Sequence, residues 1–546
     1  MNLQILSQKE GRSPMYDIII KNGKVIDGAG NPWFYATVGI KDGKIKTMGV
    51  IDKQDFGSAK VIDAKNMIVC PGFIDIHSHA DDSLLMDQKL ECLVRQGITT
   101  CVTGNCGSSM APLSLKAREY TEQRLQGMME ELSDFKISWL TFKEYFEWLD
   151  KQGSSINVVP LVGLDPICMS VLEGIARQAT PEELERMKDY IEEAMQAGAF
   201  GMSTGLIYAP QMYTSTEEII ELAKVVGKHG GLYFSHIRNE GDQVVEAIQE
   251  LIDIVEKSGC IGGQIAHHKI AGPKNWGKSK DTLQLITEAN ERGLNIRADQ
   301  YPYNRGMNSL VASLPGWARE GKIEDVLIRI QDPETREKIK QDMLEQIEKS
   351  QIGWDKIFIA RVITTKWKDI EGLSIDEITQ KKNKPDCFTT FCEIILDDEG
   401  RTRKLLEYGS EEDIQQIMRH KYVMIGTDAH SVPFGRGKPH PRFYGTYPKI
   451  LGKYVREEKV LDLEQAIRKM TSFPAQTLYL GDRGLLKEGM WGDIVIFNPK
   501  TVIDKATYLN PHQYPVGIHY VLVNGQIVLE NDQHTGKLAG KILRRS

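Results

Sequence analysis

The stretch FIDIHSHADD, residues 73–82, decides the fold class of this chain. An apolar run ends there in two histidines, His77 and His79, which lie two positions apart. Side chains at positions i and i+2 of an extended chain point to the same side, so both imidazoles can reach one ion at the end of a strand. A histidine at a strand end is also a common surface residue, and this spacing occurs by chance. The other apolar runs must decide between the two interpretations.

Seven similar apolar runs follow, and most of them come after a helical pattern. They read GITTCVTGNCG, INVVPLVGL, AFGMSTGL, GLYFSHIR, CIGGQIAHHK, LNIRADQYPY and YVMIGTDAH. Strands that are apolar on both faces and alternate with amphipathic helices are typical of a parallel sheet. One helix start is well marked, because Thr180, Pro181 and Glu183 form a capping box with proline at the first helical position. The pattern predicts an α/β fold, a closed (β/α)8 TIM-like barrel.

The two ends of the chain have a different pattern, in which short strand-like runs alternate with turns. The pairs Asn22-Gly23 and Asp42-Gly43 predict hairpins near the start, and Asn524-Gly525 predicts another near the end. We interpret residues 15–70 and 484–546 as one small β-sandwich domain formed by both chain ends. Residues 71–483 are the predicted barrel, interrupted by a charged, largely helical insertion at about 304–420. Residues 1–14 are expected to be a loose, disordered N-terminal extension or the product of an upstream start.

Composition limits the class of protein and the kind of partner. With 546 residues, 41% hydrophobic and 26% charged, the chain can bury a large core. Its net charge of -7 gives no basic surface for nucleic acid, and no run approaches the roughly 18 apolar residues of a membrane span. The eight cysteines lack the CxxC spacing of zinc ribbons and fit a reducing compartment. We expect a cytoplasmic protein with a small-molecule partner, and the sequence does not decide whether it forms a homo-oligomer.

Polar side chains stand at the ends of several predicted barrel strands, where the active site of such a barrel lies. The candidates for metal ligands are His77, His79, Cys106, His236, His267 and Asp428. Each alone has a simpler explanation: Cys106 can be a small buried hydrophobe, and Asp428 can cap the next helix. Together they are hard to obtain by chance, because unpaired polar groups at one end of a barrel carry a desolvation cost. The set therefore favours a metal site.

The types of ligand predict the metal and its chemistry. Thiolate and imidazole select Zn²⁺ over magnesium or calcium, although cobalt, manganese or iron can substitute. A catalytic zinc lowers the pKa of a bound water to about 7, which makes hydrolysis the expected reaction. Asp428 is the natural general base, because a carboxylate there can take the water proton and return it to the leaving nitrogen.

At these residues the sequence resembles the amidohydrolase superfamily and, within it, the D-aminoacylase (N-acyl-D-amino-acid deacylase) family. PGFIDIHSHAD and GTD are shared widely in the superfamily. More specific to the subfamily are GNCGSSMAP, STGLIYAP, SHIRNEG, AHHK, DQYPY and PHPRFYGTYPKILGKYVRE. The resemblance covers nearly the whole chain from about Tyr16. It implies zinc-dependent hydrolysis of the amide bond of N-acyl-D-amino acids, giving a carboxylate and a free D-amino acid.

The resemblance also implies roles for individual residues. The tight zinc site would be held by Cys106, His236 and His267, and a second, weaker site by His77, His79 and Asp428. His268 would then be structural. The substrate's α-carboxylate would be bound by Tyr208, Lys269, Tyr301 and Arg442. The lysine and the arginine supply the fixed positive charge that a free carboxylate requires.

Two departures from the family pattern concern the substrate pocket. The run YPYNRGMNSL places Met307 where a hydroxyl is expected, so a substrate contact is lost or passes to Asn308 or Ser309. The loop after Asp428, AHSVPFGRGKPHPR, is longer than usual. Both changes concern the acyl group and the side chain of the substrate rather than the metal chemistry.

Two other functions remain open at this point. A cyclic amidase of the dihydroorotase or hydantoinase type is disfavoured by GNCG and PHPR, and an assay with cyclic imides would discriminate it. A catalytically silent scaffold on the same fold would be expected to have lost ligands, whereas this chain keeps all six. The preference for D over L substrates rests on the resemblance alone, and one metal or two is undecided.

Overall fold

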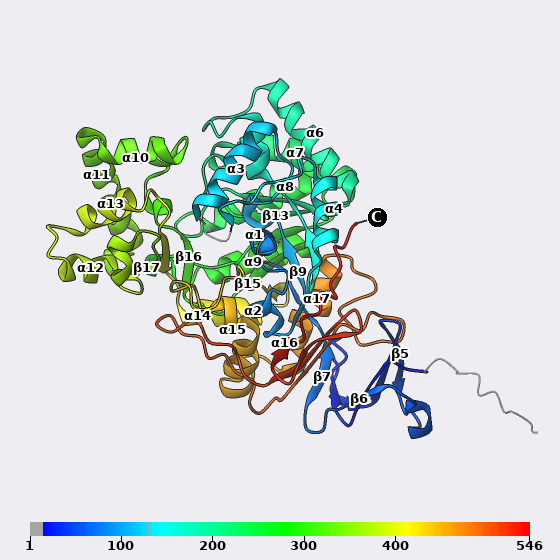
Figure 1. Cartoon of the computed structure of the whole chain (residues 1–546). Helices are drawn as coiled ribbons and strands as arrows, with labels where there is room; N and C mark the ends of the chain where they lie inside the picture. Colours follow the sequence, from blue (N-terminus) through cyan, green and yellow to red (C-terminus); the bar gives the residue numbers. More distant parts are fainter. Residues whose placement is uncertain (1–14, 129–131, 546) are drawn as a thin grey trace, which may run out of the picture.

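The structure is a computed structural model that describes residues 15–128 and 132–545 (Figure 1). The predicted extension at residues 1–14 lies outside the described residues. The described chain forms a barrel, a β sandwich and an insertion between two barrel strands. None of the described helices is long and apolar enough to cross a membrane. The domain boundaries given above stay predictions.

A closed barrel of parallel strands forms the centre of the molecule, which confirms the predicted fold class. Its strands are β8 (Phe73–Asp75), β9 (Ile98–Thr103), β10 (Asn157–Pro160), β11 (Val162–Gly163), β12 (Gly201–Gly205), β13 (Leu232–His236), β14 (Gly263–Ile265), β15 (Ile296–Gln300) and β19 (Val423–Ile425). The third predicted run is split, because β10 pairs with β9 and β11 pairs with β12. A parallel bridge between Ser78 and Ala429 joins the first strand to the last.

Side chains along the barrel strands alternate between the interior and the surrounding helices, as the pleat of a strand requires. Val102 and Phe234 belong to an apolar cluster inside the barrel. Their neighbours Cys101 and Tyr233 pack instead in the cluster that contains helix residues such as Leu222. The surrounding helices include α6 (Pro181–Ala197), α7 (Thr216–Lys228), α8 (Val244–Ser258), α9 (Ser279–Glu291), α14 (Glu411–Arg419), α15 (Arg442–Lys449) and α16 (Leu463–Met470). The predicted capping box at Thr180 starts α6.

Two sheets form the β sandwich, at the lower right of Figure 1. One contains β1 (Ile18–Lys21), β4 (Thr37–Lys41), β5 (Lys44–Gly49) and β6 (Lys60–Asp63). The other contains β2 (Lys24–Val25), β3 (Phe34–Tyr35), β7 (Ile68–Pro71), β20 (Ile494–Phe497), β21 (Ile518–Val523), β22 (Gln526–Glu530) and β23 (Gln533–His534). The second sheet thus combines strands from both chain ends. Along β20, Ile494 and Ile496 face the sandwich core, whereas Val495 and Phe497 join the large cluster shared with the barrel.

Two of the three predicted hairpin turns are confirmed and one is wrong. Asp42-Gly43 joins β4 to β5, and Asn524-Gly525 joins β21 to β22, in antiparallel register. Asn22-Gly23 forms a turn, with Asn22 at φ 65°, but the strands on either side of it do not pair. β1 and β2 belong to different sheets, because the chain crosses from one layer of the sandwich to the other at this turn.

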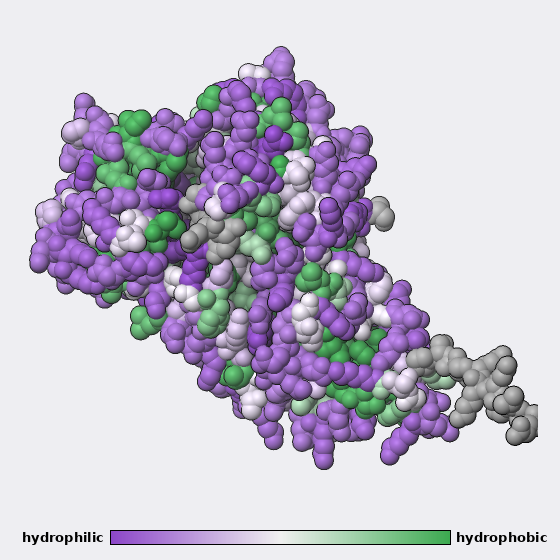
Figure 2. Space-filling model, in the orientation of Figure 1, coloured by the Kyte–Doolittle hydropathy of each residue, from purple (hydrophilic) through white to green (hydrophobic). Residues whose placement is uncertain are grey.

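The insertion forms a lobe with its own apolar core, at the left of Figure 1. Its helices are α10 (Ile323–Gln331), α11 (Pro333–Ser350), α12 (Ile375–Lys381) and α13 (Cys387–Asp397). It also contains an antiparallel sheet that the sequence did not reveal: β16 (Arg305–Ser309), β18 (Arg403–Glu407) and β17 (Ile357–Arg361). The last helix of the predicted range, α14, packs on the barrel instead. The face in Figure 2 is mostly hydrophilic, with hydrophobic residues gathered over this lobe and over the sandwich.

Candidate metal centre

One cavity of about 450 Å³ collects nearly all the predicted site residues. Nine of the ten line it: His79, Cys106, Tyr208, His236, His267, Lys269, Tyr301, Asp428 and Arg442. The tenth, His77, is fully buried and contacts Cys106. Side chains separated by more than 300 positions in the sequence therefore meet at one end of the barrel.

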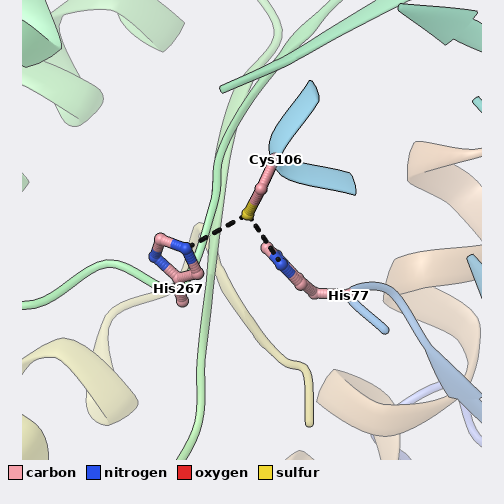
Figure 3. Close-up of side chains that lie close together, drawn as sticks. All are labelled: His77, Cys106 and His267. Carbon is pink, nitrogen blue, oxygen red and sulfur yellow. Dashed lines mark hydrogen bonds between the residues drawn. The ribbon is translucent and has the colours of Figure 1, made fainter. Parts of the chain in front are cut away.

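Cys106 lies between two histidines (Figure 3). Its Sγ is 3.4 Å from His77 Nε2 and 3.4 Å from His267 Nε2. Burial opposes ionisation of this thiol, but the adjacent His267 and His77 rings lower its pKa well below the usual value. A thiolate beside two imidazoles is a ligand set that suits zinc.

A second group of donors shares His77 with the first. His79 Nε2 is 3.0 Å from Asp428 Oδ1, and His77 Nε2 is 3.6 Å from the same oxygen. A third group consists of His236, Glu240 and His267, and the donor atoms in each group lie within 4.8 Å of one another. The resemblance implied a tight set of Cys106, His236 and His267. His267 and His77 each lie 3.4 Å from Cys106 Sγ, and His236 is also near enough to lower the pKa of this thiol.

Three of the predicted ligands have a left-handed backbone, which side chains other than glycine rarely adopt. The φ angles are 54° at Cys106, 34° at His267 and 49° at Asp428. Such conformations cost about 1–3 kcal/mol each and cluster at functional sites, where the surrounding structure enforces them. Here they turn each side chain from its strand end toward the common cavity.

Asp299 is a residue of the site that the sequence analysis missed. It is fully buried at the end of β15 and accepts hydrogen bonds from His267 N at 2.9 Å and Gln264 Nε2 at 2.8 Å. Its Oδ2 is also 3.3 Å from His77 Nδ1. A carboxylate in this position fixes the tautomer and the orientation of a ligand histidine. Its only sequence signal is its place as the first residue of DQYPY, at the end of the run LNIRADQYPY.

Glu240 is the second missed residue, and it occupies the loop after β13. Its Oε1 is 2.5 Å from Lys269 Nζ, 3.2 Å from His267 Nδ1 and 3.4 Å from His236 Nε2. Lys269 Nζ also lies 2.7 Å from His267 Nδ1. The positive charge of Lys269 is thus already matched by a carboxylate. His268 turns away and bonds Thr282 Oγ1 through Nε2 at 3.0 Å, in agreement with a structural role.

The Asp428 carboxylate is ion-paired as well as buried. Arg442 Nη1 lies 2.8 Å from its Oδ2. Burial opposes ionisation, but Arg442 and His79 lower the pKa of this carboxyl well below its usual value. The Arg442 guanidinium also lies 4.6 Å from the centre of the Tyr301 ring, whose hydroxyl bonds the Tyr408 hydroxyl at 2.8 Å. The carboxylate at the centre of the site is therefore charged.

His236 provides a direct test of whether the site fits a metal. Both of its ring nitrogens are buried and neither has a hydrogen-bond partner among the described residues. A buried imidazole whose nitrogens have no hydrogen bond is unfavourable unless a further group binds one of those nitrogens. The residues present fit a bound zinc ion, because imidazole, thiolate and carboxylate donors converge around this ring, whose nitrogens have no hydrogen bond among the described residues.

Comparison with known proteins agrees with this geometry. The sequence profile described as the amidohydrolase family matches residues 60–529, most of the chain. The chain belongs to the amidohydrolase family. Its relatives within the family include D-aminoacylase from Alcaligenes xylosoxydans xylosoxydans, 33% identical over 98% of this chain and 99% of that protein. N-acyl-D-glutamate deacylase from the same organism is 34% identical over 97% of this chain and 96% of that protein.

A solved amidohydrolase structure is similar over nearly the whole chain. It is the N-acyl-D-glutamate deacylase of Bordetella bronchiseptica, in complex with zinc and a phosphonate inhibitor that mimics the tetrahedral intermediate of its reaction. The TM-score is 0.80 at 32% identity, and the match covers 97% of this chain and 99% of that one. The resemblance stated from the sequence motifs to the deacylase branch of the family is confirmed.

Proposed function

We propose that this amidohydrolase removes the acyl group from N-acyl-D-amino acids by zinc-dependent hydrolysis of the amide bond. The observation that carries the proposal is the cluster of Cys106, His77 and His267 beside the Asp428–Arg442 ion pair, all at one cavity. Relatives that are 33% and 34% identical over nearly the full chain are N-acyl-D-amino-acid deacylases by name. The products are a carboxylate and a free D-amino acid.

The six histidine, cysteine and aspartate donors are assigned as metal ligands. We keep Cys106, His236 and His267 in the tight site. We add His77 to it, because His77 Nε2 lies as close to the sulfur as His267 Nε2 does, at 3.4 Å. His79 and Asp428 belong to a second, weaker position. When bound, zinc supplies a Lewis acid that polarises the amide carbonyl and lowers the pKa of a water molecule to about 7.

Asp428 is assigned as the general base and acid. Its Oδ1 faces His79 and its Oδ2 faces Arg442, so the carboxylate is held in place and charged before the reaction. The ionised carboxylate accepts a proton from the attacking water and returns it to the leaving nitrogen. Arg442 and His79 lower the pKa of this carboxyl, so it is ionised at neutral pH and can accept the proton.

The substrate's α-carboxylate is assigned to the polar end of the same cavity. Arg442 Nε is buried without a hydrogen-bond partner, so one donor of the guanidinium is available in addition to the contact with Asp428. Lys269 and Tyr301 line the cavity on the same side as Arg442, and Tyr208 lies against His236 with ring centroids 5.1 Å apart. A carboxylate here would share Lys269 with Glu240.

A cytoplasmic location and a small-molecule partner complete the proposal. The eight cysteines are free thiols and seven of them are buried, which fits a reducing compartment. The partner is the N-acyl amino acid that the cavity would hold, and neither nucleic acid nor a membrane is needed as a partner.

The test measures amine release from matched N-acetyl-D- and N-acetyl-L-amino acids by the zinc-loaded protein. We expect turnover of the D series only, and a fall of at least about 1,000-fold in kcat with Asp428→Asn, because the proton transfer and a metal contact are lost together. Asp165→Asn is the matched control, since Asp165 lines the same cavity outside the donor groups. Absence of turnover on both series with zinc bound would sink the proposal and direct the search to cyclic amides.

A further inference from the structure

The insertion builds one wall of the cavity and places arginines there. Arg361 on β17 and Arg403 on β18 both line the cavity. They are also paired residues in the antiparallel register of the two strands, so their side chains leave the same face of the sheet. Like charges directly opposite each other destabilise a sheet. An anion in the cavity beside them would relieve that repulsion.

Most other cations that line the cavity already have partners. Arg442 and Lys269 face the carboxylates described above, and Arg401 lies 3.1 Å from Glu399. Arg361 also interacts with other groups. Arg124 and Arg403 differ, because among the described residues no hydrogen bond or ion pair is found for either side chain. Arg124 is exposed and can be solvated by water, whereas Arg403 is half-buried.

Arg403 is partly withdrawn from water, which makes its lack of a partner unfavourable. Its charged neighbours include Arg442 and Arg124, and burial lowers its pKa. The nearby Asp82 carboxylate is engaged by His430 Nδ1 at 3.2 Å. A guanidinium in such a site binds a carboxylate well, because its planar fork donates two parallel hydrogen bonds and the contact is charge-assisted.

We propose that Arg403 binds a second carboxylate of the substrate, distinct from the α-carboxylate. This inference rests on the proposed deacylase function and narrows its substrate class to N-acyl-D-amino acids with an additional acidic group. The group can belong to the amino-acid side chain or to a dicarboxylic acyl chain. Sequence identity does not decide whether the substrate has this additional acidic group, since the D-aminoacylase at 33% and the N-acyl-D-glutamate deacylase at 34% are about equally similar to this chain.

The experiment compares kcat/KM for two pairs of substrates that differ only in a carboxylate and its amide. The first pair is N-acetyl-D-glutamate and N-acetyl-D-glutamine, and the second is N-succinyl-D-leucine and its terminal amide. In each pair the ratio of acid to amide measures recognition of the second carboxylate. We expect one of the two ratios to fall about tenfold or more in Arg403→Met, and less in Arg403→Lys, which keeps the charge.

The matched control is Arg401→Gln, because Arg401 lines the cavity but is already paired with Glu399. Its two ratios should equal those of the wild type. The pair that responds to Arg403→Met identifies which part of the substrate carries the carboxylate, and Arg403→Gln replaces that variant if it does not fold.

A change of less than threefold in both ratios would overturn the role of Arg403. Failure of the zinc-loaded wild type to hydrolyse any of the four compounds, or N-acetyl-D-leucine, would instead overturn the proposed function, and this inference with it.

Discussion

Asp299 joins the two histidines that approach Cys106. It holds His267 through the backbone amide and His77 through Nδ1, so one carboxylate orients side chains from two different strands. The motif around each histidine is visible in the sequence, but the contact is not, because it depends on which strands become neighbours. Glu240 is hidden for the same reason: its three cationic or imidazole partners come from β13 and from the loop after β14.

The contacts of Asp299 predict a loss of metal affinity when they are weakened. Asp299→Asn keeps the shape of the side chain but removes its charge, and we expect zinc affinity to fall about 10- to 100-fold. Competition with a chelator measures it. Asp398→Asn is the control, because Asp398 is equally buried and bonded to backbone amides in the insertion, away from the cavity. Unchanged zinc affinity in a folded Asp299→Asn protein would show that this carboxylate does not support the ligands.

At the scale of elements, periodicity and turn chemistry predict most of the barrel and its helices. The eight apolar runs all become barrel strands, and the capping box at Thr180 starts α6. The failures have physical causes. Asn22-Gly23 specifies a turn but not the sheet that each flanking strand enters. β16, β17 and β18 were missed because they are short strands with charged residues such as Arg305, Arg361 and Arg403, which pair only across long stretches of chain.

The end of α14 carries a prediction about pH. His420 follows this helix, its Nε2 bonds Thr287 Oγ1 at 3.1 Å, and burial together with Lys469 and Lys421 lowers its pKa to about 4. The folded state therefore favours the neutral ring, whereas the unfolded chain takes up a proton near the ordinary value of about 6.5. This contribution to stability is complete above about pH 6.5 and is lost as the pH falls toward 4.

Urea unfolding at pH 7 and pH 5 measures this effect. We expect His420 to account for about 1 kcal/mol of the fall in the free energy of unfolding, a value reduced to allow for its partial exposure. In His420→Gln the fall should be smaller by that amount. Equal losses in the variant and the wild type would show that this ring does not contribute.

At the scale of the whole molecule, closure of the barrel brings the site together. The bond from Asp428 N to His77 O and the bridge at Ser78–Ala429 join the last strand to the first. This closure places side chains from residue 77 and residue 428 in contact. The family motifs allowed all six donors to be named from the sequence. Their grouping could not be, because it depends on distances set by closure and by the left-handed backbone at Cys106 and His267.

The insertion and the sandwich affect this centre differently. The insertion reaches the cavity through β16, β17 and β18, and Met307, Asn308 and Ser309 all line it, so the departure noted in the sequence lies at the substrate pocket. The sandwich remains outside and packs one face of its larger sheet against the barrel. The insertion therefore contributes residues to the cavity wall, whereas the candidate metal ligands come from the barrel.

The most direct test of the central claim is the position of zinc in crystals of the zinc-loaded protein, located by anomalous scattering at the zinc edge. The account predicts a strong peak within about 2.0–2.3 Å of Cys106 Sγ and His267 Nε2. The Asp299→Asn crystal should show the same peak with lower occupancy. Stoichiometric zinc bound elsewhere, or no peak at Cys106 in active crystals, would contradict the assignment of this cluster as the metal centre.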